Sequence, residues 1–94
     1  MSALWIALVD VKDADTYGKY AELATKAITE HGGSFLARGG RCRQLEGKER
    51  LRNVVIRFPS FDAALECYNS DTYRKALEFS SVSSERDMVI VEEL

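Results

Sequence analysis

The order strand, helix, strand occurs twice in this chain of 94 residues, and that repetition limits the fold more than any other feature. Each half, 1–47 and 48–94, begins with an apolar run typical of a β-strand, continues with helical spacing and ends with a shorter or weaker strand pattern. A chain of this length has room for one hydrophobic core. The sequence therefore predicts one α+β domain over residues 1–94.

The first half predicts a strand, a helix and a second strand. Trp5–Val9 is apolar, with β-branched and aromatic residues. Asp13 or Asp15 is placed to cap a helix that includes Tyr17 and ends at the glycine pair 32–33. Residues at three- and four-residue steps form one stripe of this helix, namely Tyr17, Tyr20, Ala21, Ala24, Ile28 and His31. The second strand is expected at Ser34–Ala37, with a bulge at glycines 39–40 and a continuation over Arg41–Gly47.

The second half repeats this order. Val54–Phe58 predicts a strand that ends at a proline. Ser60 is placed to cap a helix, and Ser70 to cap a second helical piece after a break. We expect Ser80–Ser84 to form a polar loop and Met88–Val91 to form the last strand.

Together these elements predict a ferredoxin-like βαββαβ fold, with an antiparallel four-stranded sheet and two helices on one face. Right-handed crossovers would place the first and third strands side by side at the centre. Asp10 and Arg57 interrupt those two strands near their carboxyl ends. If the strands are parallel neighbours the two charges could pair across the sheet, and the alternative is that both lie at a hydrated rim.

Both faces of the first and last predicted strands are apolar, which favours a homodimer through the open sheet face. In the first strand, one face carries Trp5, Ala7 and Val9 and the other carries Leu4, Ile6 and Leu8. In the last strand, one face carries Met88 and Ile90 and the other carries Val89 and Val91. The helices cover one face only, so a second copy is the economical cover for the other. At about 25 cal/mol per Å², a face of ~800 Å² per partner would hold such a pair. The alternative is a monomer with a few exposed valines.

Composition excludes several classes of function. Thirteen basic and fifteen acidic residues give a net charge of −2, which argues against nucleic-acid or membrane binding. Two cysteines and one histidine are too few for a disulfide scaffold or a His-rich metal site, so we expect no metal and no cofactor. The apolar run Ala3–Val9 has no basic residue before it and is too short to span a bilayer. We therefore expect a cytoplasmic protein with reduced thiols.

Five sequence blocks resemble one bacterial family. They are His31–Gly40, Glu46-Gly47, Val54–Ser60, Tyr68–Tyr73 and Asp87–Glu92. In this order and spacing they resemble the family catalogued as domain of unknown function 1330. The resemblance implies a dimeric α+β barrel, a fold that small cofactor-free monooxygenases, isomerases and ligand-binding stress proteins also use. It implies no reaction, and Arg57 stands where the family often has an acidic residue.

Tyrosine hydroxyls and an imidazole lie on the otherwise apolar face of the first predicted helix. Polar groups in such a position suggest a pocket between the helices and the sheet. The predicted ligand-binding residues there are Tyr17, Tyr20, Tyr68, Asn69 and Tyr73. His31 is the candidate catalytic base because its ordinary pKa is near neutrality. The alternative for His31 is that it interacts favourably with the helix dipole. The alternative for the tyrosines is that they are ordinary residues of the hydrophobic core.

A basic segment supplies the candidate anion clamp. Six cations lie within fifteen residues, namely Arg38, Arg41, Arg43, Lys48, Arg50 and Arg52. Arg38 precedes two glycines, so a flexible backbone there could bring its guanidinium to a carboxylate or phosphate. The alternative is a hydrated hairpin edge protected by charge.

These observations predict a homodimer that binds a small anionic or oxygenated organic molecule in a helix–sheet pocket. Any catalysis would be cofactor-free proton transfer or oxygenation, with His31 as base and Arg38 as clamp. The alternative is a non-enzymatic binding or interaction module.

Overall fold

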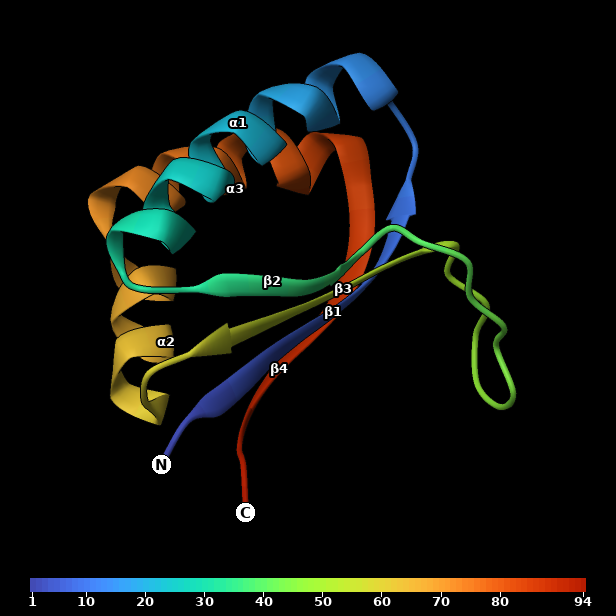
Figure 1. Cartoon of the computed structure of the whole chain (residues 1–94). Coiled ribbons are helices and arrows are strands. Elements are labelled where there is room, and N and C mark those ends of the chain that lie inside the picture. The colour runs from blue at the N-terminus through green and yellow to red at the C-terminus, as the bar shows by residue number, and fades with distance from the viewer.

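The computed structural model describes residues 1–94, in which three helices pack on a four-stranded sheet (Figure 1). In chain order the elements are β1 (Ala3–Val11), α1 (Ala14–Glu30), β2 (Ser34–Arg38), β3 (Arg52–Phe58), α2 (Phe61–Asn69), α3 (Asp71–Ser83) and β4 (Ser84–Glu92). Helices α1 and α3 lie side by side over the sheet, and α2 lies at the end opposite the 39–51 loop.

The sheet has the order β2-β3-β1-β4, and every neighbouring pair is antiparallel. The first and third strands therefore lie together at the centre, which confirms the predicted ferredoxin-like arrangement. Along β1, alternate residues Trp5, Ala7 and Val9 are buried under the helices.

An aromatic cluster occupies the space between sheet and helices. The Trp5 ring lies 5.5 Å from the Phe58 ring and 5.1 Å from the Tyr73 ring, centroid to centroid. Tyr73 in turn contacts Tyr20 of α1 at 5.9 Å. These contacts connect β1, β3, α1 and α3, so they fix the height of the helices above the sheet.

The helices begin at the residues that the sequence indicates. The side chains of Asp13, Ser60 and Ser70 accept hydrogen bonds from the backbone N–H groups of Thr16, Ala63 and Tyr73. The predicted break at Ser70 separates α2 from α3. None of the helices combines the length and the apolar character that crossing a membrane requires.

The expected continuation of the second strand over Arg41–Gly47 is wrong. Residues 39–51 form no strand, because Gly39 takes a φ of +69° and turns the chain out of the sheet after β2. Ion pairs with β4 hold the returning part of this loop. Lys48 Nζ lies 3.0 Å from Glu85, and Arg50 Nε lies 3.0 Å from Asp87.

The expected loop at Ser80–Ser84 is also wrong, because α3 continues to Ser83 and β4 begins at Ser84. Serine hydroxyls there donate to backbone carbonyls within the helical turn, with Ser83 Oγ 2.6 Å from Phe79 O and Ser84 Oγ 2.7 Å from Ser80 O. Ser83 is buried, and its carbonyl accepts from the backbone of residues 12 and 13. The polar residues therefore form the end of a helix, with Ser80 and Ser83 on its buried side.

The suggested pair of Asp10 and Arg57 does not form. Because β1 and β3 are antiparallel, Arg57 lies opposite Leu4, at the other end of the sheet from Asp10. Arg57 Nε instead donates to Glu93 at 2.7 Å, and Asp10 lies 3.6 Å from Arg50.

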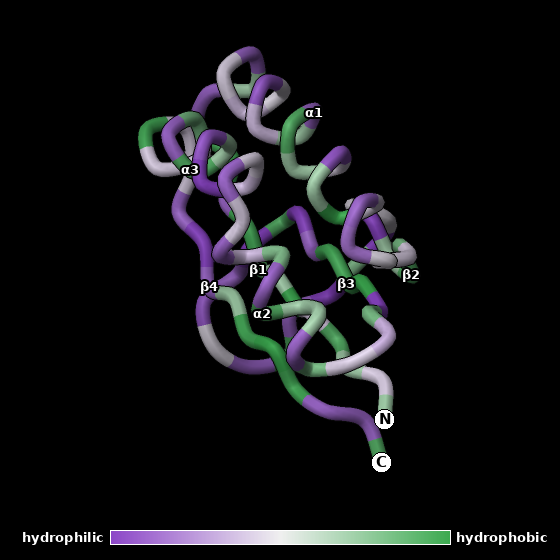
Figure 2. The backbone as a smooth tube through the Cα atoms, turned by 90° about the vertical axis from the view of Figure 1, so that its left-hand side faces the viewer, coloured by the Kyte–Doolittle hydropathy of each residue, from purple (hydrophilic) through white to green (hydrophobic).

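The sheet face away from the helices carries an apolar surface. Leu4, Ile6 and Leu8 of β1 are half-buried there, and Val89 and Val91 of β4 are 54% and 46% exposed. Figure 2 shows this hydrophobic part of β4 close to the C-terminus. No helix covers this face (Figure 1), and the returning part of the 39–51 loop reaches it through the pairs of Arg50 with Asp10 and Asp87.

The double role of Ser70, as the end of α2 and the cap of α3, gives a stability prediction. Ser70→Ala removes the acceptor for the Tyr73 N–H, so we expect the free energy of unfolding to fall by about 1 kcal/mol. Chemical denaturation measures this change. Ser81→Ala, at an exposed serine of the same helix, is the control and should change stability less. Equal effects of the two substitutions would contradict the assignment.

Candidate small-molecule pocket

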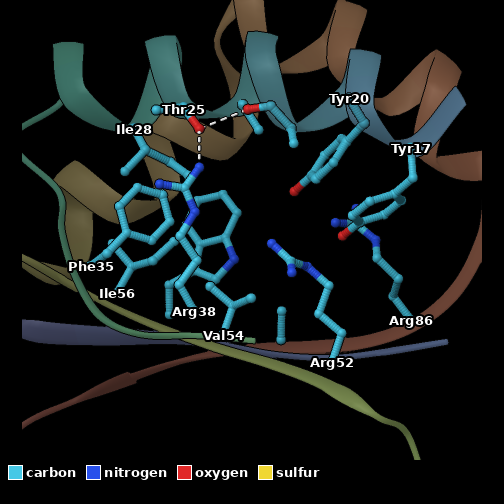
Figure 3. Close-up of a pocket in the computed structure, with 14 residues that line it drawn as sticks. Tyr17, Tyr20, Thr25, Ile28, Phe35, Arg38, Arg52, Val54, Ile56 and Arg86 are labelled. Atoms are coloured by element: carbon cyan, nitrogen blue, oxygen red, sulfur yellow. Dashed lines mark hydrogen bonds between the residues drawn. The ribbon is translucent and has the colours of Figure 1, made fainter. Parts of the chain in front are cut away.

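A pocket lies between α1 and the sheet, in the layer that holds the core (Figure 3). Ten of its fourteen lining residues are hydrophobic. The lining residues are Trp5, Ala7, Tyr17, Tyr20, Ala21, Ala24, Thr25, Ile28, Phe35, Arg38, Arg52, Val54, Ile56 and Arg86.

Small side chains on both walls explain why the core is hollow here. Ala7 on β1 faces Ala21 and Ala24 on α1, while larger side chains surround all three. The cavity measures about 30 Å³. A space of that size holds one or two water-sized groups.

Phenol groups form one polar side of the site. The Tyr17 and Tyr20 rings lie 4.9 Å apart, and the Tyr20 hydroxyl is 2.7 Å from the Tyr73 hydroxyl. Burial raises the pKa of both Tyr17 and Tyr73, so these phenols stay protonated at neutral pH. In Figure 3 the Tyr20 hydroxyl points from α1 toward the sheet. Tyr73 does not line the pocket and reaches the site only through its hydrogen bond to Tyr20.

Arg38 lies at the mouth of the pocket, at the end of the edge strand β2. One guanidinium nitrogen donates to the Thr25 hydroxyl at 2.7 Å, which links β2 to α1. The guanidinium also lies 4.1 Å from the centre of the Phe35 ring. Arg38 is exposed, so these two contacts form the side wall of the pocket that borders solvent.

Two further arginines, Arg52 and Arg86, line the pocket, and the sequence pattern predicted this position for neither. Arg52 precedes the predicted third strand and Arg86 precedes the predicted fourth. Strand alternation extended back from Val54 and from Met88 would have placed both on the helix-facing side. Burial acts to lower the pKa of Arg86. The electrostatic attraction and hydrogen bonding of the Tyr20 and Tyr73 phenol oxygens are together larger, so the pKa of Arg86 is raised above its ordinary value.

The remaining predicted site residues lie away from this pocket. His31 caps the C-terminal end of α1, with its Nδ1 2.7 Å from the carbonyl of Ala27. Tyr68 lines a separate apolar groove between α2 and β4, and Asn69 accepts a hydrogen bond from Arg74 at 2.9 Å. The structure thus places Tyr17, Tyr20 and Arg38 in the pocket lining and leaves His31, Tyr68, Asn69 and Tyr73 outside it.

The basic segment does not form one patch. Arg38 and Arg52 face the pocket, whereas Lys48 and Arg50 pair with acidic residues at the open side of the sheet. Cys42 lies in the exposed part of the loop. No three His, Cys, Asp or Glu side chains come close enough together to hold a metal ion.

Comparison with known families gives one match. The family model described as domain of unknown function (DUF1330) matches residues 2–94. A search of the curated proteins found no match.

Several solved structures share the fold at low sequence identity. The RPA0582 protein of unknown function from Rhodopseudomonas palustris is 17% identical, with a TM-score of 0.80 over 99% of this chain and 82% of that one. SnoaB, a cofactor-independent oxygenase from Streptomyces nogalater, is 8% identical, with a TM-score of 0.71 over 99% and 93%. A dimeric protein of unknown function and ferredoxin-like fold from Bacteroides fragilis is 12% identical, with a TM-score of 0.65 over 98% and 96%.

The buried phenols predict a delayed tyrosine titration. Tyr17 and Tyr73 have pKa values raised above the ordinary 10.0, so the folded state keeps protons that the unfolded state releases. Their stabilisation is present below pH 10 and is lost as the pH rises further. We expect part of the phenolate absorbance of the native protein to appear only above pH 10, together with unfolding, and this part to shrink in Tyr73→Phe. Ionisation of all four tyrosines in one step while the chain stays folded would contradict this.

Proposed function

We propose that this chain, which belongs to the DUF1330 family, is a homodimeric protein that binds a small oxygenated or anionic organic molecule between α1 and the sheet. The observation that carries the proposal is the composition of the pocket wall. Aromatic and aliphatic side chains form most of it, while phenol and guanidinium groups enter from three sides. Such a wall accepts an apolar body and orients one polar group.

The open sheet face supports the dimer. Its apolar row of Leu4, Ile6 and Leu8 runs along the central strand, and Val89 and Val91 extend it onto β4. The molecule is a flat body of 33 × 31 × 17 Å, so its broad side has space for the ~800 Å² that a standard interface takes from each partner. A twofold axis would pack the same surface against itself, at the ~10 Å spacing of stacked sheets.

Binding without catalysis fits the lining better than an enzymatic role. Proton transfer or cofactor-free oxygenation needs a base beside the substrate. The fourteen lining residues include no carboxylate, imidazole or thiol, and His31 lies at the helix end. A general-base role for His31 stays a prediction, and His31→Gln should leave ligand binding unchanged.

A charge in the middle of the open face tests the dimer. Ile6→Lys would bury an unpaired ammonium in the proposed interface, so we expect the mass to fall from twice 10.6 kDa to 10.6 kDa. Size-exclusion chromatography with light scattering measures this. Glu22→Lys on the exposed side of α1 is the control and should stay dimeric. A wild-type monomer would overturn the dimer.

Filling the cavity tests the pocket. Ala21→Leu adds apolar volume to the wall, whereas Ala14→Leu makes the same change at an exposed position of the same helix. The single tryptophan, Trp5, lines the pocket, so its fluorescence reports binding. We expect wild type and Ala14→Leu to respond to benzyl alcohol or to benzoate in a saturable way, and folded Ala21→Leu to lose that response. The same saturable response in both variants would place binding elsewhere, and no response in wild type would refute the proposal.

A further inference from the structure

The sheet register places Arg52 and Arg86 on either side of one residue. Val9 of β1 is the partner of Arg52 on β3 and of Arg86 on β4. Val9 is buried under the helices, so both arginine side chains leave the sheet on that same face. Their Cα atoms are separated by two strand spacings, about 10 Å in all. Long side chains that start this far apart can bring their guanidinium groups to one ligand.

Both guanidinium groups contain an unsatisfied buried donor. Arg52 Nε and Arg86 Nη1 are buried and have no hydrogen-bond partner in the protein. Neither arginine forms a salt bridge, and no acidic residue lines the pocket. Buried donors without partners are costly, so in solution a group from outside the chain, water or a ligand, accepts from them, and a ligand that replaces such water has to supply an acceptor.

Neighbouring residues hold these arginines in place. The Arg86 guanidinium lies 4.5 Å from the centre of the Tyr20 ring. Arg52 packs against Gly39, where an added Cβ would lie 2.5 Å from a guanidinium nitrogen. The positive φ of +69° also favours glycine at this position. Figure 3 shows the Arg52 group directed into the space beneath Tyr20, with Arg86 beside Tyr17.

We propose that Arg52 and Arg86 form a carboxylate-binding site at the inner end of the pocket, and that the ligand is a small aromatic monocarboxylate. This inference rests on the proposed function and names the ligand class for the same site. The carboxylate accepts from Arg52 Nε and Arg86 Nη1, and the ring lies along Trp5 and Phe35.

The space of the site favours a carboxylate over a phosphate. A carboxylate, with two oxygens, is the smaller of the two anions that guanidinium groups bind, and a cavity of about 30 Å³ has room for little more than those two oxygens. The ring would extend toward the mouth, where Arg38 has to leave Thr25 to admit it.

Matched ligands test the inference on the wild-type protein. Benzoate and benzamide have nearly the same shape, but only benzoate carries the charge. At pH 7 we expect Trp5 fluorescence titrations to give benzoate the lower Kd by about tenfold or more, because bonds to a charged acceptor are the stronger ones. Inorganic phosphate and acetate are the further probes, and both should bind more weakly than benzoate.

Arginine variants locate the charge. Arg52→Gln and Arg86→Gln should each raise the Kd for benzoate by about tenfold and leave that for benzamide unchanged. Arg74→Gln on the exposed side of α3 is the matched control and should change neither. Circular dichroism verifies that each variant is folded. If a variant does not fold, the comparison of benzoate with benzamide on the wild-type protein decides whether the carboxylate site exists.

The outcomes separate this inference from the proposed function. Equal affinities for benzoate and benzamide, or tighter binding of phosphate, would overturn the carboxylate site and leave a small-molecule pocket. Binding of benzoate that survives both arginine substitutions would also overturn it. Failure of benzoate, benzamide and benzyl alcohol alike would refute the pocket itself.

Discussion

The pairing of β1 with both β3 and β4 determines where the side chains of the site lie. Because side chains alternate along a strand, one register assigns Trp5, Ala7 and Val9 to the helices and Leu4, Ile6 and Leu8 to the open face. Small Ala7 leaves space under α1, Trp5 forms one wall, and Val9 separates the two inner arginines. A shift of one residue would reverse all of these positions at once.

The two faces of β1 therefore connect the proposed binding site with the proposed interface. The pocket uses the side chains under the helices, and the dimer uses those on the opposite side of the same strand. In the proposed dimer β1 would be covered on both faces, whereas β2 remains an edge strand. The walls from β1 and β3 therefore lie within the sheet, and Arg38, on the edge strand β2, forms the side of the site that borders solvent.

Much of the fold could be predicted from the sequence, because strong local signals agreed with the tertiary packing. The caps at Asp13, Ser60 and Ser70 and the stripe containing Tyr17 and Tyr20 are examples. The inner arginines were missed because β3 and β4 begin before their apolar runs, and polar residues there resembled loop. Arg52 and Arg86 share Val9 of β1 as their register partner, and spacing within one strand cannot show that two other strands place residues on either side of it. Similarly, the serines before β4 form a helix end because the chain buries Ser83.

The central claim is that two arginines, on the two strands that flank β1, bind one anionic group in the pocket. Nuclear magnetic resonance of the arginine Nε–H groups tests it most directly, with assignments from Arg52→Gln and Arg86→Gln. We expect benzoate to shift the Arg52 and Arg86 resonances together with the Trp5 indole resonance, and benzamide to leave the two arginine signals in place. Shifts confined to the exposed loop arginines, Arg41 and Arg43, would contradict it.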